Sequence, residues 1–318
     1  MTRHWRHARH AKRVGFAVFL LVVGALILHA ARSIAWQDVV AALRALDATT
    51  IAAALALTAA SYLLYSCYDL AARRYADHHV ATPRVMMIAL IAYAFSLNIG
   101  ALVGGTGFRF RMYAREGVAL GRIARVVAFC IATNWIGYVA LAGGLFASGA
   151  IVPPTEFALR GLSTGTGLRV LGVAMLCATV GYLIACRATH GRIFHVRGHH
   201  LRLPSLHLAL LQVGMAAGNW ALMAAIVARF LPRTGDAMVL AAVLLAAIAT
   251  AIAHIPAGLG VAEAVFIGLL GHTTPTPELI AALLAYRACY YVAPLVLALI
   301  AYALLEFHGR PARSTPLR

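Results

Sequence analysis

The sequence predicts an all-α polytopic membrane protein with about eight transmembrane helices, and three observations carry this prediction. The 318 residues are 62% hydrophobic and only 12% charged, whereas soluble domains carry about 25% charged residues. Apolar runs long enough to cross about 30 Å of hydrocarbon recur along the whole chain. Arginines gather in short blocks between these runs, as in the loops that orient membrane proteins. The net charge of +17 therefore points to anionic lipids as partners and not to nucleic acid.

The expected spans follow one another with short links. One membrane domain is therefore predicted at 14–305, between a basic N-terminus at 1–13 and a tail at 306–318. The run at 14–31 follows basic residues but lacks a small-residue cleavage site, which is typical of a retained helix rather than a signal peptide. The predicted spans cover residues 14–31, 49–71, 85–103, 123–147, 168–186, 206–231, 237–254 and 278–305.

The arginine blocks predict the orientation of the chain, because loops rich in Lys and Arg remain in the cytoplasm. The N-terminus, the links at 72–84 and 187–205 and the C-terminal tail are basic. Both termini are therefore predicted to be cytoplasmic. The links expected on the opposite side are nearly neutral and cover residues 32–48, 148–167 and 232–236.

The stretch 85–108 does not fit this alternation. A plain span over 85–103 would carry five arginines to the wrong side: Arg109, Arg111, Arg115, Arg122 and Arg125. The cluster "GGTG", which contains Gly105 and Gly107, instead predicts a broken or re-entrant segment at about 96–108, with these glycines as hinges. Non-helical backbone at membrane depth is tolerated only where it is buried in protein or lines a wet cavity. The segment therefore also predicts a cavity.

A second glycine-rich segment, at about 254–271, has the same character. It contains, in order, Pro256, Gly258, Gly260 and Glu263. At an offset of 153 residues, Gly105 aligns with Gly258 and Gly107 aligns with Gly260. Transporters often place interrupted segments at corresponding positions of two repeats. Two identities in a chain with 27 glycines leave an internal repeat and a chance match equally open.

Four charged side chains fall within the apolar segments or at their edges: Asp69, Arg109, Glu263 and Arg287. A charge at the bilayer centre costs about 2.5–3.5 kcal/mol on insertion scales, so it persists only if it pairs or meets water. Two simpler interpretations stay open for the first two. Asp69 precedes Arg73 by four residues, which permits an interfacial salt bridge, and Arg109 can extend toward the interface.

Glu263 and Arg287 are predicted to form an ion pair that faces a shared cavity. They lie on consecutive apolar elements joined by a short loop at 271–277. At 1.5 Å per helical residue, Glu263 lies about 12 Å and Arg287 about 13.5 Å from this loop. Antiparallel neighbours place residues of similar depth side by side, so each charge gives the other its missing partner.

The remaining polar residues carry weaker predictions. His254 and Glu263 are the candidate proton carriers within the membrane. Three arginines of one helical face, Arg111, Arg115 and Arg122, predict a patch for lipid head groups. The five cysteines lack C-x-x-C spacing, and the chain lacks ATPase, hydrolase and metal-binding signatures. No cofactor, no metal and no enzymatic activity are therefore expected.

Four stretches together resemble one known family: "SLNIGALVGGTGFRFRMYAREG", "TNWIGYVALAGG", "HIPAGLGVAEAVF" and "AYRACYYVAPL". They are similar to the lysylphosphatidylglycerol synthase/flippase transmembrane family, and within it to the YbhN-like bacterial inner-membrane proteins. The resemblance covers roughly residues 60–305. The combination of P-x-G-L-G-V-x-E with a later Y-R-x-x-Y-Y-x-x-P is its most specific part.

The resemblance implies phospholipid translocation or lipid-linked chemistry at a polar cavity formed by discontinuous helices. By motif match, the cavity positions would be Arg109, Glu263, Arg287 and Asp69. The soluble aminoacyl-transferase domain of fused family members has no counterpart in the short tail, so lipid aminoacylation is not expected. The leading hypothesis is a flippase-like transporter of phospholipids. The alternatives are a scaffold or regulator of a lipid-modifying or glycosyl-transferring partner enzyme, and a transferase on a lipid carrier; the oligomeric state stays open.

Overall fold

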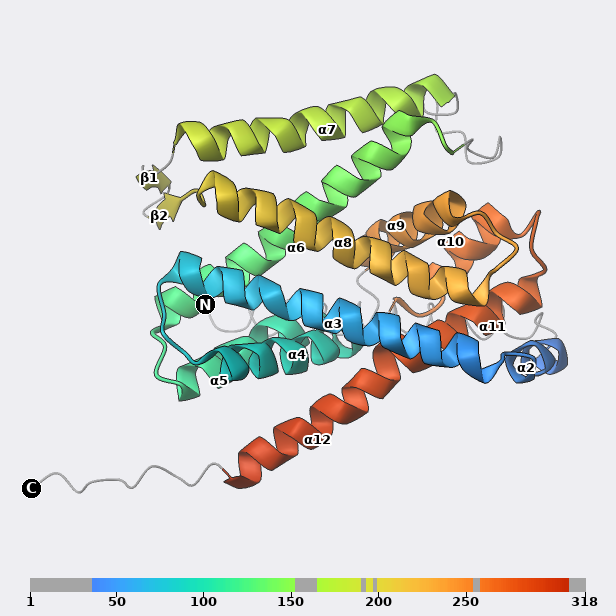
Figure 1. Ribbon diagram of the computed structural model, residues 1–318, viewed down its shortest axis with the longest axis horizontal. Coiled ribbons are helices and arrows are strands. Elements are labelled where there is room, and N and C mark those ends of the chain that lie inside the picture. The colour runs from blue at the N-terminus through green and yellow to red at the C-terminus, as the bar shows by residue number, and fades with distance from the viewer. Residues whose placement is uncertain (1–35, 152–164, 190–192, 197–198, 254–257, 309–318) are drawn as a thin grey trace, which may run out of the picture.

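The computed structural model describes residues 36–151, 165–189, 193–196, 199–253 and 258–308. Several of its long helices run along the long axis of the bundle, and others cross it obliquely (Figure 1). The predicted span 14–31 and the residues His254 and Pro256 lie outside these ranges. The elements, in order, are α2 (Trp36–Arg44), α3 (Ala48–Ala76), α4 (Thr82–Ile99), η1 (Ala101–Gly107), α5 (Phe108–Arg115), α6 (Leu120–Ser148), α7 (Gly165–Ala188), β1 (Ile193–Val196), β2 (His199–Arg202), α8 (Leu206–Phe230), α9 (Asp236–Ala253), α10 (Val261–Leu270), α11 (Thr276–Arg287), η4 (Ala288–Val292) and α12 (Ala293–His308).

Seven segments of the described chain are long and apolar enough to cross a membrane, and each coincides with a predicted span. The last of them, Thr276–Glu306, combines α11, η4 and α12. The predicted all-α polytopic fold is thus confirmed. Two small elements were not predicted: the β1–β2 hairpin, and α2, whose buried Val39 packs against Ile280 and Ala281 of α11.

The surface of the bundle is apolar where a soluble protein would carry charges. Large aliphatic side chains of α7 and α12 point outward, including Val170, Ile184 and Leu297, which are 64%, 61% and 68% exposed. The interior instead holds small residues, mostly alanines, and tyrosines such as Tyr68, Tyr113 and Tyr290. This arrangement suits a solvent of lipid chains, which makes exposed aliphatic surface inexpensive and favours close packing of small residues between helices.

The chain reverses direction between α4 and α5, so that α4, η1 and α5 form the first helical hairpin. Arg84 at the start of α4 forms a salt bridge of 3.2 Å with Glu116, which follows α5. Nearer the tip, the rings of Phe95 and Phe108 stack at 4.0 Å. These partners lie at similar separations on either side of residues 100–102, as in an antiparallel pair. Both ends of the hairpin therefore lie at one end of the bundle.

Two glycines make this tight reversal possible. Gly100 has φ of 102°, a backbone conformation that side chains with a Cβ rarely adopt. At Gly104, a Cβ atom would overlap the backbone carbonyl of Phe95 in the facing arm. The predicted hinge Gly105 lies close to Ser96, with 2.9 Å between an added Cβ and its Oγ. Gly107 ends the π-helical segment η1, but its φ of −60° and the open space around it show no requirement for glycine in this structure.

The second hairpin consists of α9 and α10. Thr234, just before α9, and Thr274, just after α10, hydrogen bond through their hydroxyl groups at 3.3 Å. Near the tip, a Cβ on Gly258 would overlap the side chain of Thr250. The predicted hinges Gly258 and Gly260 have φ of 60° and 80°, so both use the conformational freedom of glycine.

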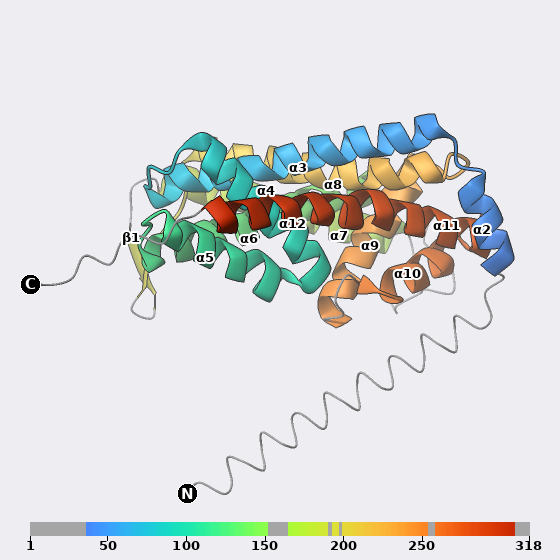
Figure 2. The ribbon, with the colours of Figure 1, turned by 90° about the horizontal axis from the view of Figure 1, so that it is seen from below.

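The two hairpins enter the bundle from opposite ends (Figure 2). In each half of the chain a long helix precedes the hairpin and another follows it: α3 and α6 in the first half, α8 and α11–α12 in the second. The first arms, α4 and α9, are both 18 residues long. The helices α3 and α8 pack side by side and run in opposite directions, since Tyr75 near the end of α3 donates to the carbonyl of Arg202 just before α8. This order of elements favours an inverted internal repeat over a chance match.

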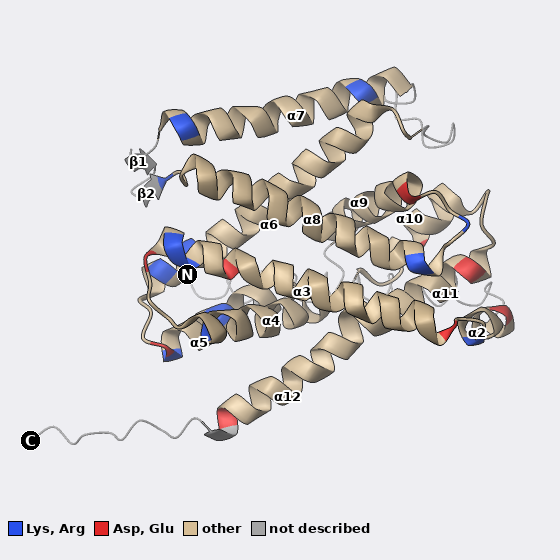
Figure 3. Ribbon diagram, viewed as in Figure 1, with Lys and Arg blue, Asp and Glu red and all other residues tan. Residues whose placement is uncertain are grey.

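Charged residues are unevenly divided between the two ends of the bundle (Figure 3). The end where α3 stops and α4, α6 and α8 begin is called the basic end. Its described acidic residues, Asp77, Glu116 and Glu306, are outnumbered by arginines: Arg73, Arg74, Arg84, Arg111, Arg115, Arg122, Arg125, Arg187 and Arg202. The opposite end, where α9 and α11 begin, mixes basic residues with Asp38, Asp47, Asp236 and Glu278.

Candidate functional site

Two ion pairs lie inside the bundle, and each joins the returning arm of a hairpin to a neighbouring helix. Arg109 of α5 pairs with Asp69 of α3, and Glu263 of α10 pairs with Arg287 of α11. The four charged residues that the sequence singled out are therefore paired with one another. The contact between Glu263 and Arg287 is the one predicted from their equal depth.

The pair of Asp69 and Arg109 is enclosed on all sides. The Arg109 Nε and Nη2 atoms donate to the two carboxylate oxygens at 3.0 and 2.8 Å, which is a bidentate geometry. Tyr113 donates to the same carboxylate at 3.1 Å, and the thiol of Cys130 approaches it at 3.6 Å. The third guanidinium nitrogen donates to the carbonyl of Gly105 at 3.2 Å. The Asp69 side chain is fully buried and that of Arg109 is 5% exposed.

This closed geometry decides between the interpretations left open for Asp69. Its partner is Arg109, while Arg73 donates to the carbonyl of Val80 and to the hydroxyl of Thr82 across the α3–α4 loop. Because every oxygen of the carboxylate is occupied by a donor, the pair has the character of a structural lock. Neither Asp69 nor Arg109 lines the membrane cavity described below.

The pair of Glu263 and Arg287 is more open. Nη2 and Nε of Arg287 lie 2.8 and 3.1 Å from one oxygen of Glu263. The other oxygen accepts from the backbone N–H of Gly260 at 2.8 Å, so the carboxylate also caps α10. Arg287 donates to the carbonyl of Gly258 at 3.3 Å. The side chains of Arg287 and Glu263 are 13% and 21% exposed.

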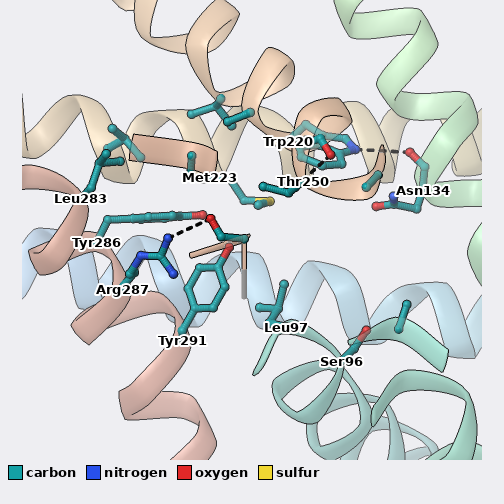
Figure 4. Close-up of a pocket in the computed structure, with 18 of the residues that line it drawn as sticks. Ser96, Leu97, Asn134, Trp220, Met223, Thr250, Leu283, Tyr286, Arg287 and Tyr291 are labelled. Atoms are coloured by element: carbon teal, nitrogen blue, oxygen red, sulfur yellow. Dashed lines mark hydrogen bonds between the residues drawn. The ribbon is translucent and has the colours of Figure 1, made fainter. Parts of the chain in front are cut away.

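Arg287 lines a cavity of 290 Å³ between the tips of the two hairpins, here called the membrane cavity. Gly100 and Gly258 contribute backbone from the two tips, and Tyr286 and Tyr291 flank the guanidinium (Figure 4). The far wall contains further aromatic and polar side chains from α4, α6, α8 and α9: Ser96, Asn134, Trp135, Trp220 and Thr250. The cavity thus combines aromatic walls with a few polar groups and one cation, as ligand pockets commonly do.

A closed ring of hydrogen bonds holds the centre of the bundle together. Ser61 donates to the amide oxygen of Asn219 at 2.7 Å, so its oxygen accepts from Tyr290 at 2.7 Å. Because the Tyr290 hydroxyl proton is donated to Ser61, the Tyr290 oxygen accepts from the hydroxyl of Tyr93 at 2.8 Å. Tyr93 in turn accepts from the side-chain amide of Asn219 at 3.4 Å. The ring satisfies buried polar groups of α3, α4, α8 and η4 at once, which suits a structural role.

Stacked tyrosines link this ring to both ion pairs. Tyr65 stacks on Tyr93 at 3.5 Å and lies under the guanidinium of Arg109. The ring centroids of Tyr290 and Tyr291 lie 5.9 Å apart. The guanidinium of Arg287 lies over the ring of Tyr291, 5.9 Å from its centroid. These tyrosines were not among the functional residues predicted from the sequence. Their signal was present in "SYLLYSCYDL" and "AYRACYYV", where hydroxyl-bearing rings recur within apolar spans.

The remaining predicted residues lie elsewhere. Arg111 and Arg115 both bind Glu306 at the end of α12, at 3.1 and 2.6 Å, instead of forming an open arginine patch. Arg122 lies apart from them at the start of α6. Within the described part of the chain, no cluster of three potential metal ligands occurs. His254 and Pro256 lie outside the described residues.

Comparison with known proteins agrees with this architecture. Residues 14–298 match the family described as the lysylphosphatidylglycerol synthase TM region. The chain is 40% identical over 308 residues to the inner membrane protein YbhN of Escherichia coli (strain K12), with 96% of each chain covered. It is 30% identical over 313 residues to the protein slr0712 of Synechocystis sp., covering 94% of this chain and 93% of the relative.

Proposed function

The chain belongs to the lysylphosphatidylglycerol synthase transmembrane family, and from this membership and the membrane cavity we propose that it binds phospholipid head groups and moves them between leaflets. Its location would be the inner membrane, as the name of the Escherichia coli relative, inner membrane protein YbhN, states for that protein. Both termini and the basic end would face the cytoplasm, where arginine-rich loops are retained.

The observation that carries the proposal is the position of Arg287. Its guanidinium lies at membrane depth, between two interrupted hairpins, on the wall of a cavity. A charge at this depth is costly and marks a pathway for polar groups in most membrane proteins. A guanidinium also matches the geometry of phosphate oxygens better than other cations do. The residues around it supply aromatic surface for the apolar part of a head group.

The size of the cavity sets how a lipid would be handled. Its 290 Å³ is at the lower end of ligand pockets, which are about 300–1,000 Å³. The cavity is therefore suited to a head group, while the acyl chains remain in the surrounding lipid. Glu263 lies behind Arg287, so a phosphate would compete with this carboxylate for the guanidinium, and a cationic head group would meet the carboxylate instead. Glu263 is also the described candidate for proton coupling.

In this proposal the two hairpins are re-entrant: α4–η1–α5 enters from the cytoplasm and α9–α10 from the opposite side. Cysteine labelling can test this in a variant lacking the five native cysteines. We expect an impermeant maleimide to reach His272→Cys, at the end of α10, from outside the cell. Ala114→Cys, in exposed α5, should react only from the cytoplasmic side. Labelling of Ala114→Cys from outside would show that α4 crosses the membrane as a plain span.

Lipid movement is tested with the purified chain in proteoliposomes, by following the access of a quencher to a fluorescent phospholipid. We expect movement by the native chain and at least a tenfold slower rate for Arg287→Gln. Arg233→Gln is the matched control, because Arg233 is 86% exposed at the opposite end. A folded native chain that moves no lipid would contradict the proposal and favour the scaffold alternative.

A further inference from the structure

A second cavity, of 470 Å³, lies at the basic end of the bundle. It is formed by the α3–α4 loop at 78–81, the α5–α6 loop at 116–119 and the side chain of Arg122. None of the described residues that line it also lines the membrane cavity. We refer to it as the loop cavity.

A buried histidine without a partner lines the loop cavity. His78 is only 4% exposed, and neither of its ring nitrogens has a hydrogen-bond partner among the described residues. Its ring meets the ring of Tyr113 edge-on at 5.2 Å. Most buried polar side chains in proteins are hydrogen bonded, so an unpaired imidazole needs an explanation. A ligand in the loop cavity would supply the missing acceptor.

Two helices begin at the same cavity without caps of their own. The N-cap residues of α4 and α6 are Ala81 and Ala119, which both line it, and neither helix has a side-chain cap or an acidic residue in its first turn. Alanine is a poor N-cap because it cannot accept from the free N–H groups of the first turn. The start of a helix carries partial positive charge and favours an anion.

The opposite end of the molecule shows that this arrangement is specific. The helices that correspond to α4 and α6 in the second half are α9 and α11. Each carries an acidic residue in its first turn, Asp236 in α9 and Glu278 in α11. The chain thus supplies its own anions to the starts of α9 and α11 and leaves those of α4 and α6 without one.

The charges around His78 also favour an anion. Burial lowers the pKa of His78, and the nearby Arg73 and Arg122 lower it further, with Asp69 acting in the opposite direction. The acidic residue among the described lining residues is Glu116, whose carboxylate is held by Arg84 at 3.2 Å. Arg122 therefore faces a cavity in which the sole described carboxylate already has a partner.

We propose that the loop cavity is an anion site that takes a tetrahedral phosphate-type oxyanion, either free in solution or as the phosphate of a phospholipid head group. Arg122 and the starts of α4 and α6 provide the positive field. His78 donates to the anion from its protonated ring. The site stands apart from the proposed lipid movement, because it uses none of the residues of the membrane cavity.

Sulfate is the first probe, because it remains a dianion throughout the pH range in which histidine titrates. We would titrate it into the purified full-length chain by calorimetry at pH 6.0 and pH 7.5. We expect saturable binding that is tighter at pH 6.0, since an anion favours protonated His78 and raises its pKa. Arg122→Gln should weaken binding by about tenfold or more, as for the loss of a charge-assisted hydrogen bond. His78→Asn should abolish the pH dependence.

Controls separate this site from general charge effects. His272→Asn and Arg233→Gln, at the opposite end, should leave sulfate binding unchanged. His79→Asn should retain the pH dependence, because His79 lines the cavity but its neighbour His78 is the buried ring. An unaltered melting temperature and gel-filtration profile would show that each variant is folded. Arg122 is exposed, so Arg122→Gln tests the site even if His78→Asn does not fold.

The source of the anion is distinguished in nanodiscs. If the head group of a membrane lipid fills the site, sulfate affinity should be lower in nanodiscs containing phosphatidylglycerol than in those of phosphatidylcholine alone. Equal affinity in both would identify a soluble phosphate as the ligand. The proposal is overturned if sulfate binding is absent, or if Arg122→Gln leaves it unchanged. All of these outcomes are measured as sulfate binding and not as lipid movement, so they do not depend on the function of the membrane cavity.

Discussion

The ion pairs Asp69–Arg109 and Glu263–Arg287 are built from similar parts. In each, one charge lies on the returning arm of a hairpin and the other on a neighbouring helix. Each guanidinium also donates to the carbonyl of a hairpin glycine, Gly105 or Gly258, and lies over a tyrosine ring. The arrangement differs in sign, because the first hairpin carries the arginine and the second carries the acid.

The difference between them lies in exposure and in how the carboxylate is satisfied. Asp69 is fully buried and takes donors from Arg109 and Tyr113 on its two oxygens. Glu263 is 21% exposed, and Arg287 lines a cavity. A charge sealed in protein can only hold helices together, whereas a charge that meets a cavity can exchange partners. The two pairs therefore differ in burial: the buried pair Asp69–Arg109 has a structural role, and the partly exposed pair Glu263–Arg287 is the candidate binding site.

The largest effect is expected at the closed pair. Asp69→Asn leaves Arg109 buried without its counter-charge, and the loss of one partner of a buried pair costs about 3–5 kcal/mol. We expect a large fall in melting temperature and in the yield of folded protein. The double variant Asp69→Leu/Arg109→Met should recover much of this loss, because apolar residues can replace a buried pair. A double variant as unstable as Asp69→Asn would show that the pair has a role beyond neutralisation.

A smaller loss of stability is expected at the open pair, together with a larger loss of function. Arg287→Gln and Glu263→Gln each remove a charge-assisted hydrogen bond, worth about 1.5–3 kcal/mol, and water relieves the charge that remains. The Arg287→Gln/Glu263→Gln double variant should be more stable than the sum of the two losses implies, since neither charge is left alone. Thermal melting of all three measures this, and purely additive losses would contradict the pairing.

Much of this comparison was accessible from the sequence, but not all. Hydropathy located the spans because seven described segments have the length that lipid requires. Depth paired Glu263 with Arg287 because their elements are consecutive. The pairing of Asp69 with Arg109 was not accessible in this way. It joins α3 to α5 across an intervening helix, and a periodicity argument gives the face of a helix but not its non-consecutive neighbour.

The glycines show the same limit at the level of the backbone. The sequence identified a cluster that breaks the helix, yet it could not rank its members. Gly104 leaves no room for a Cβ against the facing arm, which depends on how closely α4 and η1 approach, while Gly107 ends the π-helical segment η1 with open space around it. Such a ranking needs the distance between two arms, and neither composition nor spacing contains it.

Replacement of these glycines tests whether the hairpin positions the closed pair. Gly104→Ala would force a Cβ into the carbonyl of Phe95, and overpacking of this kind costs about 1–3 kcal/mol. Because η1 leads directly into Arg109, we expect lower thermal stability. Gly107→Ala is the matched control, since open space surrounds it and alanine favours helix. A loss of stability in Gly107→Ala equal to that in Gly104→Ala would contradict this account of the hairpin.

The smallest effect is expected at a third ion pair, which separates geometry from burial. Arg115 binds Glu306 in a bidentate manner at 2.6 and 2.7 Å, contacts at least as short as those of Asp69 with Arg109. These two side chains are 46% and 42% exposed, however, so water and salt screen them. We expect Glu306→Gln to leave the melting temperature unchanged within error, and 1 M NaCl to remove any difference at low salt. If Glu306→Gln were as destabilising as Asp69→Asn, bidentate geometry rather than burial would determine the strength of these pairs, and the distinction between the closed and the open pair would lose its basis.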